Sequence, residues 1–346
     1  MDSLLPLGFL LAAFALHADP ASAGCGNKSL NFMELTGSAP KILGPLTADW
    51  IESYRQREPG RKIVIPGPLG PPQGKLDPHL QAFLDGRSDF AFLTREIAET
   101  DLDSFRAAHG NEPVIVPVAG GSWNSFGFVD PVVMIVNEAN PIRALSFEQI
   151  DAIYSTSRHR GRAPLTDWGS AGARGWQGRP IRIMGGDGWS DEESARALTL
   201  RRHVLSVGTK RGVWRAAPDS GGEADVVGRV ARDPLAIGFT GFGHMEKGVR
   251  VVAIAERAGE RPVLPTRATV ASGRYPLGRS VDLLLARGPQ GCVSPALSAF
   301  AVFLVGREGQ AAIRRQPPFL PLTREQVATA QSRLRAATCA GEEARN

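Results

Sequence analysis

Short apolar runs alternate with amphipathic segments through the first third of the chain. The runs have the length and the β-branched or aromatic content of buried strands, and the segments between them carry apolar residues at helical spacing. The predicted strands are 30–35, 61–66, 88–93 and 113–119, and the predicted helices are about 41–57, 77–86 and 99–109. This order is typical of an α/β fold, whose ligands bind near the carboxyl ends of the strands.

The alternation continues to the end of the chain. A strand at about 131–137 ends in a turn, and a helix at 146–155 follows with Ser146 as its N-cap. The Gly- and Arg-rich stretch 160–179 predicts an exposed loop. The remaining predicted strands are 181–186, 235–242, 250–255 and 275–286, and the remaining helices are 190–204, 225–232, 294–306 and 324–336.

A chain of 346 residues, 42% of them hydrophobic, is long enough for about two domains. The order of the strands suggests that the chain leaves one sheet after the strand at 131–137 and returns at the strand 235–242. We therefore expect a larger lobe from 27–137 and 237–340, with a smaller lobe, 138–236, inserted into it. Two such crossings make a hinge, and a cleft between lobes is a natural binding site.

The stretch Leu30–Tyr54 reads as a strand, a tight turn over Thr36–Pro40 and an amphipathic helix. Gly37 allows unusual backbone angles in the turn, Ser38 is a good N-cap, and Pro40 suits a first helical turn. A helix N-terminus leaves backbone N–H groups without internal partners, and with the helix dipole these suit an oxyanion. The alternative is an ordinary capped helix.

The first residues have the pattern of a secretory leader. Leu4–Leu16 is an apolar run of signal-peptide length, and Ala21-Ser22-Ala23 matches a cleavage site. This predicts a signal peptide at 1–23 and export to the periplasm, although Asp2 stands where a positive charge is usual. No later stretch is long and apolar enough to span a bilayer.

The three cysteines suggest different fates in an oxidising compartment. Cys25 follows Ser22-Ala23-Gly24 in a pattern similar to a lipoprotein box, which leaves lipid anchoring open beside simple cleavage. Cys292 and Cys339 are able to pair and brace the C-terminal helix. The alternative is three unpaired thiols.

The charge pattern argues against nucleic acid as a partner. The chain has 40 Lys and Arg against 35 Asp and Glu, and loss of the first 24 residues, with two Asp and no Lys or Arg, would raise the net charge from +5 to +7. Basic clusters at 158–162, 201–203 and 210–211 lack the interleaved aromatics of a single-strand binding platform. We interpret them as solvated faces that steer anions weakly.

Motifs for catalysis are missing from the sequence. It contains neither Gly-x-Ser-x-Gly nor His-Glu-x-x-His, and its six His are scattered. Asp187 with Glu192 or Glu193 would make a carboxylate pair, but acids at a helix start are usually partners of the dipole. We therefore predict no enzyme, no catalytic residue, no cofactor and no metal site.

A series of short motifs carries a family resemblance over about 300 residues. They are Gly37-Ser38 before a helix with Trp50 and Tyr54, Leu84–Ala91, Thr94-Arg95, Val136-Asn137 with Asn140-Pro141, Leu145–Ile150 with Ile153-Tyr154, Asp187-Gly188, Pro234–Phe239, Gly273–Arg279 and Gly309-Gln310. In this order they resemble the phosphate-binding solute receptors of bacterial ABC transporters. The resemblance implies a two-lobed type II periplasmic-binding-protein fold, α/β, with two mixed sheets flanked by helices.

The resemblance also implies a cleft with three ligand-binding loops. The first is Thr36, Gly37, Ser38 and Ala39, and the second is Thr94 and Arg95. The guanidinium of Arg95 suits a grip on two oxygens, and its alternative partner is Glu99. The third is Asp187, Gly188 and Ser190.

The third loop departs from the family. Such receptors carry a pattern like Arg-x-Asp-Gly-Ser-Gly-Thr, whereas here Gly185 replaces the Arg, and Trp189 and Asp191 replace Ser and Thr. Ser190 with Glu193 also makes a capping box of its own. Near residue 70, where the family has hydroxyls, the chain has Gly67–Pro72 with three prolines.

Because the first loop matches the family and the third departs from it, the sequence is compatible with two functions. The first is an exported, monomeric binding protein that captures phosphate or a similar oxyanion for an ABC-transporter permease. The second is a periplasmic sensor or interaction module that keeps the fold, has a degenerate anion site and works with a membrane partner. The first loop favours capture, and the stretch 185–191 favours the sensor.

Overall fold

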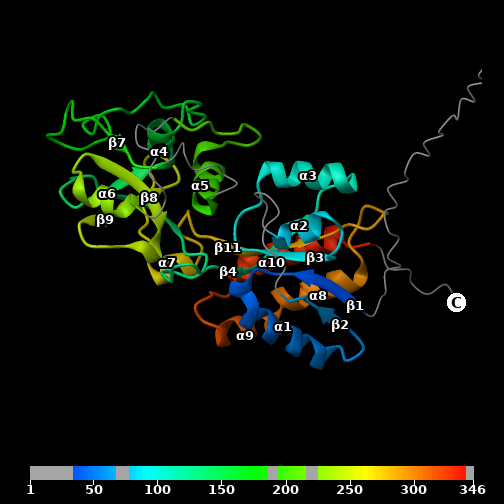
Figure 1. The fold of residues 1–346 in the computed structure, drawn as a ribbon. Coiled ribbons are helices and arrows are strands. Elements are labelled where there is room, and N and C mark those ends of the chain that lie inside the picture. The colour runs from blue at the N-terminus through cyan, green and yellow to red at the C-terminus, as the bar shows by residue number, and fades with distance from the viewer. Residues whose placement is uncertain (1–33, 68–77, 186–193, 216–224, 340–346) are drawn as a thin grey trace, which may run out of the picture. The chain divides into compact units, whose positions relative to one another are not determined.

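The computed structural model describes residues 34–67, 78–185, 194–215 and 225–339 (Figure 1). The predicted signal peptide, Cys25 and the proline-rich stretch after Gly67 lie outside these ranges. So do three predicted site residues, Asp187, Gly188 and Ser190.

The first sheet has five strands in the order β2-β1-β3-β11-β4. β1 is parallel to β2 and β3, and β11 is antiparallel to β3 and β4. The ends of β1, β3 and β4 and the beginning of β11 therefore share one edge of the sheet. The strands are β1 Glu34–Ser38, β2 Lys62–Val64, β3 Phe90–Leu93, β4 Val114–Gly120 and β11 Ser280–Leu285.

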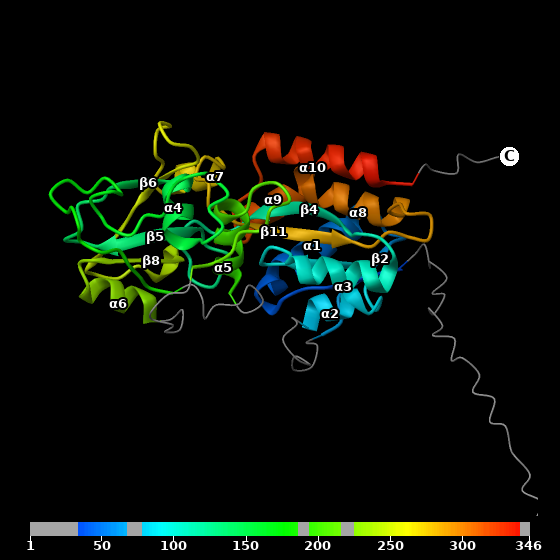
Figure 2. The same ribbon diagram turned by 90° about the horizontal axis from the view of Figure 1, so that it is seen from above.

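Alternate side chains of β3 divide the core of this sheet between two faces. Phe90 and Phe92 pack with residues of α1, α8, α9 and α10, while Ala91 and Leu93 pack with residues of α2 and α3. Figure 2 shows α8 and α10 on one side of β11 and α2 and α3 on the other. The helices are α1 Gly44–Arg57, α2 Pro78–Leu84, α3 Glu99–His109, α8 Pro295–Val305, α9 Arg307–Arg315 and α10 Arg324–Ala337.

The second sheet has four strands in the order β7-β8-β5-β9, and β10 pairs separately with β6. α6 packs on β8 and β5, and α5 packs on the same two strands. The strands are β5 Val132–Asn137, β6 Ala144–Ser146, β7 Arg182–Ile183, β8 Ala236–Gly241, β9 Val249–Val251 and β10 Ala253–Ala255. The helices are α4 Phe147–Tyr154, α5 Ala195–Leu200 with its π-helical extension η2 Arg201–Leu205, α6 Val226–Arg232, the 3-10 turn η4 Phe242–His244 and α7 Arg267–Ala271.

The chain crosses between sheets at other points than the sequence suggests. β5 and β8 were expected in the first sheet, but they pair with each other in the second, Val132 opposite Gly241. The chain thus leaves the first sheet after β4 and returns at β11. The apolar run of β5 fits either sheet equally well, so its pattern does not reveal its partner.

Two further predictions are wrong in detail. The stretch 160–179 is not an exposed loop throughout, because Trp168 is fully buried and its Nε1 donates to the carbonyl of Leu235 at 2.9 Å. The single strand predicted at 250–255 is divided at Val252 into β9 and β10, which pair in different sheets. α7 and α9 were not predicted.

Other local predictions are confirmed. Ser146 caps α4, accepting from the N–H of Gln149, whose side chain accepts from the N–H of Ser146. The predicted apolar face of the first helix is buried, with Leu46, Trp50 and Tyr54 each 1% exposed. Trp50 stacks on Phe92 with ring centroids 5.4 Å apart, which holds α1 on the sheet.

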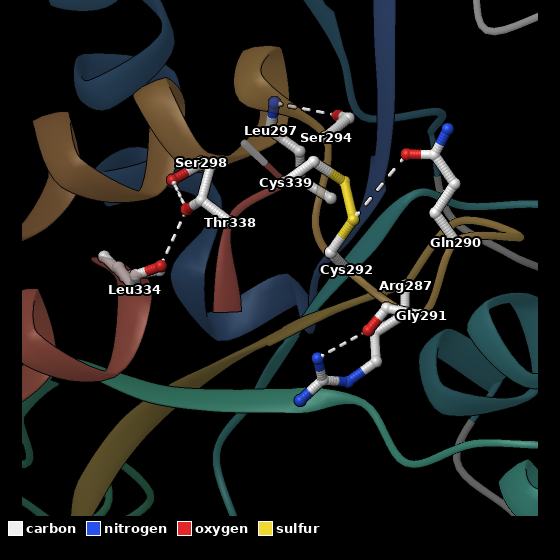
Figure 3. Close-up of a disulfide and its surroundings, with 10 residues drawn as sticks. All are labelled: Arg287, Gln290, Gly291, Cys292, Ser294, Leu297, Ser298, Leu334, Thr338 and Cys339. Atoms are coloured by element: carbon white, nitrogen blue, oxygen red, sulfur yellow. Dashed lines mark hydrogen bonds between the residues drawn. A yellow bond between two sulfur atoms is a disulfide. The ribbon is translucent and has the colours of Figure 1, made fainter. Parts of the chain in front are cut away.

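The predicted pairing of Cys292 with Cys339 is confirmed (Figure 3). The disulfide joins residues 47 positions apart in sequence, just before α8 and just after α10. Beside it, the hydroxyls of Ser298 and Thr338 lie 2.6 Å apart. The pair braces the C-terminal helix against α8, as expected.

Among the described residues no single helix is long and apolar enough to cross a membrane. α8 and α9 pass that test only together, and a 52° bend separates them.

Candidate functional site

The first predicted loop is the end of a strand and not a turn. β1 continues through Ser38, Pro40 is extended, and a 3-10 turn at Lys41–Leu43 leads into α1. The N-cap of α1 is Leu43, so the prediction that Ser38 caps this helix is wrong. The chain stays extended because Gly37 and Ser38 pair with Phe90 and Ala91 of β3.

Gly37 leaves room for the ring of Phe90 beside β1. An added Cβ would lie 2.1 Å from Cζ of Phe90, so any larger residue collides with the buried ring. Its φ lies outside the positive range that favours glycine, which corrects the expected role of this residue. Thr36 is fixed nearby, because its N–H donates to the carboxylate of Asp89 at 2.7 Å.

The Ser38 side chain already has a partner within the protein. It is 2% exposed, and its hydroxyl donates to the carbonyl of His79 in α2 at 2.8 Å. A hydroxyl carries one proton, so in this arrangement Ser38 offers a ligand only lone pairs. Ala39, 8% exposed, follows it at the edge of the sheet.

The second predicted loop lies at the end of β3, the strand beside β1. The guanidinium of Arg95 binds both carboxylate oxygens of Asp101, at 2.7 and 3.2 Å, and the carbonyl of Glu96 at 2.8 Å. Asp101, and not the expected Glu99, is its partner, and this carboxylate also accepts from the N–H of Ala98 at the start of α3. Three of the five N–H donors of Arg95 are thereby engaged.

Three charged residues near this loop were missed by the sequence analysis. Arg279, just before β11, donates to the carbonyl of Thr94 at 2.9 Å and to the carbonyl of Asp130 at 3.5 Å. Asp130 is fully buried, accepts from the N–H of Gly243 at 2.7 Å and pairs with Arg196 at 3.4 Å. These contacts connect the end of β3 to α5 and to the end of β8.

Gly241 makes room for the pair of Asp130 and Arg196. A Cβ there would lie 2.3 Å from Oδ2 of Asp130 and 2.6 Å from Nε of Arg196. The sequence signal that could have identified Asp130 is an acid inside the apolar run FVDPVVM. Arg196 is one of many arginines, and nothing near it in sequence marks it as a partner of Asp130. The structure places it in the first turn of α5, which begins at Ala195.

A second contact joins the loop after β3 to η2. His203 lies 2.6 Å from one carboxylate oxygen of Glu96, Arg202 lies 3.2 Å from the other, and Arg202 also donates to the carbonyl of Ile97 at 3.1 Å. The basic cluster at 201–203, expected to be a solvated face, is therefore partly engaged.

A cavity of about 400 Å³ lies beside Arg279, whose guanidinium also donates to Thr94. Its walls include Gly120, Gly121, Arg279 and Ser280 from the edge of the first sheet, with Arg160 and His203 from the elements around the second. Ser38, Thr94 and Arg95 do not contribute to its lining. Within the described ranges no three His, Cys, Asp or Glu side chains gather as metal ligands would.

Comparison with known proteins identifies the family. The model of the PBP superfamily domain matches residues 31–308, so the chain belongs to the PBP superfamily. It is also similar to the phosphate-binding protein PstS of Pseudomonas aeruginosa, with 26% identity over 317 residues and 90% of both chains covered.

Solved structures agree on the fold. PstS from Borrelia burgdorferi matches with a TM-score of 0.50 and 14% identity, covering 84% of this chain and 99% of that one. An ABC-type phosphate transport receptor from Vibrio cholerae matches with a TM-score of 0.50 and 19% identity, covering 83% and 99%. The expected α/β fold, with two mixed sheets flanked by helices, is confirmed.

Proposed function

We propose that this chain is an exported binding protein that captures phosphate for an ABC transporter. The single observation that best supports this proposal is the 26% identity to a phosphate-binding protein over 90% of both chains. The role is binding and not catalysis, and the partner that receives the ligand is a membrane permease.

The described residues supply one wall of an oxyanion site. Ser38 and Ala39 lie at the end of β1, Thr94 and Arg95 directly follow the neighbouring strand β3, and Arg279 directly precedes β11 beside them. Hydroxyl, amide and guanidinium donors suit a ligand rich in acceptors. Asp187, Gly188 and Ser190 belong to the opposite wall in this proposal.

Capture by this wall proceeds through exchange of hydrogen bonds. The Ser38 hydroxyl turns from the carbonyl of His79 to a phosphate oxygen, and Arg95 uses the donors that Asp101 and Glu96 leave. The exchange at Ser38 replaces a hydrogen bond to a neutral carbonyl by one to a charged ligand, which is stronger by about 1 kcal/mol.

We further propose that the elements around the two sheets act as two lobes that close on the ligand. The segments between β4 and β5 and between β10 and β11 would serve as the hinge. A signal peptide at 1–23, periplasmic export and a monomeric state complete the proposal.

The sensor alternative is supported by the same contacts. Ser38 and Arg95 are held by partners within the protein, and a family arginine is replaced by Gly185. Under this alternative the anion site is idle, and a membrane sensor protein is the partner.

Calorimetric titration with phosphate, sulfate and molybdate distinguishes the two. We expect phosphate to bind and Ser38→Ala to weaken binding about tenfold, which corresponds to one lost hydrogen bond to a charged ligand. Ser104→Ala is the matched control, because Ser104 is exposed and bonds only within α3. Absence of heat with all three anions would favour the sensor.

A further inference from the structure

The cavity beyond Arg279 has a strongly basic lining. Arg160, Arg257, Arg279 and His203 line it, and Glu256 is its one carboxylate among the described residues. A cavity of about 400 Å³ falls within the range of sites for small organic molecules. The charge and the size together point to an anion larger than an inorganic ion.

Arg160 is held in place by its neighbours. Its Nε donates to the carbonyl of Val204 at 2.6 Å, its Nη2 donates to the carbonyl of His203 at 2.7 Å, and its guanidinium lies 4.9 Å from the ring centre of Phe147. Carbonyls and an aromatic ring fix the orientation of a guanidinium without neutralising its charge.

The charges around Arg160 also favour an anion in the cavity. Burial lowers the pKa of its guanidinium, and Asp151, Glu148 and Glu256 oppose that effect through space. One carboxylate oxygen of Asp151 is already bound to the backbone N–H of Arg160. Burying a cation is costly unless an anion lies against it, and a ligand anion in the cavity would relieve that cost.

Part of the cavity lining is apolar. Tyr275, Val270, Leu320 and Pro321 form this part, and Tyr275 is fixed by a hydrogen bond from its hydroxyl to the carbonyl of Val132 at 2.8 Å. The apolar part of an organic ligand would cover these side chains, whereas an inorganic oxyanion would leave them exposed to water.

We infer that this cavity is a second ligand site, which takes a small organic anion with its charged group at Arg160 and its apolar part against Tyr275, Val270 and Leu320. The inference does not depend on phosphate capture, because it places the charged group at Arg160, whereas Arg279 contributes both to the cavity and to the proposed oxyanion wall.

The test is calorimetric titration with phenylphosphonate in saturating inorganic phosphate, which fills the proposed oxyanion site. We expect phenylphosphonate to bind under these conditions and Arg160→Met to weaken it at least tenfold. Arg257→Gln should weaken it about threefold, since its side chain is 81% exposed. Arg261→Gln, an exposed arginine outside the cavity, is the matched control.

A second variant keeps the test independent of folding, because Arg160 also holds carbonyls of η2. Gln326 lines the cavity and forms a capping box with Thr323, and Glu at this position preserves the cap. Gln326→Glu should therefore leave the unfolding midpoint unchanged and weaken phenylphosphonate binding severalfold by charge repulsion.

Three results would overturn the inference. They are no phenylphosphonate binding at millimolar concentration, complete competition by inorganic phosphate, and equal affinities of Arg160→Met, Gln326→Glu and Arg261→Gln. The variant Ser38→Ala separates the two proposals, because it should impair phosphate binding and leave phenylphosphonate binding intact.

Discussion

Arg95 and Asp101 form a two-point ion pair at the end of β3, with N–O distances of 2.7 and 3.2 Å. Asp101 is 2% exposed, and the side chain of Arg95 is 16% exposed. Arg95 is thus both a cation of the proposed anion site and a structural partner of α3. This dual role can be tested directly.

Asp101→Asn should destabilise the protein and strengthen phosphate binding. It removes the anion that competes for Arg95, and it leaves a partly buried guanidinium without its partner, at a cost of about 2–4 kcal/mol. Denaturant unfolding and calorimetry measure the two effects. Asp103→Asn, at an exposed acid of the same helix, is the control. Weaker phosphate binding by the Asp101→Asn variant would show that Arg95 acts only in the fold.

Gly37→Ala should cost several kcal/mol of stability. The added Cβ meets the ring of Phe90, which is fully buried and has nowhere to move. Gly44→Ala is the control, since a Cβ there meets nothing within 4 Å in the first turn of α1. Thermal unfolding compares them. Equal midpoints for the two variants would contradict the close packing of β1 on β3.

Loss of the disulfide should lower stability by about 4 kcal/mol, the loop-closure value for a separation of 47 residues. The double variant Cys292→Ser with Cys339→Ser is compared with the unchanged protein in guanidinium unfolding. Reductant should lower the midpoint of the unchanged protein and leave that of the double variant as it is. A reductant effect of the same size on both would mean that the bond does not form.

Asp282→Asn should stabilise the protein near neutral pH. Burial raises the pKa of the Asp282 carboxyl from 3.8 to about 6, against the hydrogen bond from Ser280, which lowers it. The folded state then binds this proton more tightly than the unfolded state, so the contribution to stability is full below about pH 4 and is lost as the pH rises through 6.

The lost stability amounts to about 2–3 kcal/mol at pH 8. Denaturant unfolding of both proteins at pH 4, 6 and 8 measures it, and the difference between them should grow with pH. Asp85→Asn is the control, because Asp85 is an exposed acid paired with Arg87. A constant difference across this range would show that Asp282 titrates normally.

Local patterns predicted the elements well, because their causes are local. The helix at Glu99–His109 and the cap at Ser146 depend on residues within one turn of each other. The apolar spacing from Leu46 to Tyr54 was likewise enough to give the buried face of α1.

Features set by distant contacts were not predictable in this way. The strand pairing of β5 with β8 joins residues about a hundred positions apart, and the ion pair of Asp130 with Arg196 spans 66. Gly37 looked like a turn glycine because nothing near it in sequence shows the ring of Phe90. At the site, Arg95 was correctly placed after a strand, whereas Ser38 was expected in a turn and lies in β1. Their partners Asp101 and His79 come from separate helices.

The position of β11 between β3 and β4 has a consequence for biogenesis. Both neighbours lie within the first 120 residues, yet the strand that joins them begins at Ser280. The first sheet therefore stays split, with unpaired strand edges, until about four fifths of the chain has been synthesised. Under the proposed export to the periplasm, this late closure would keep the first sheet open while the chain crosses the membrane.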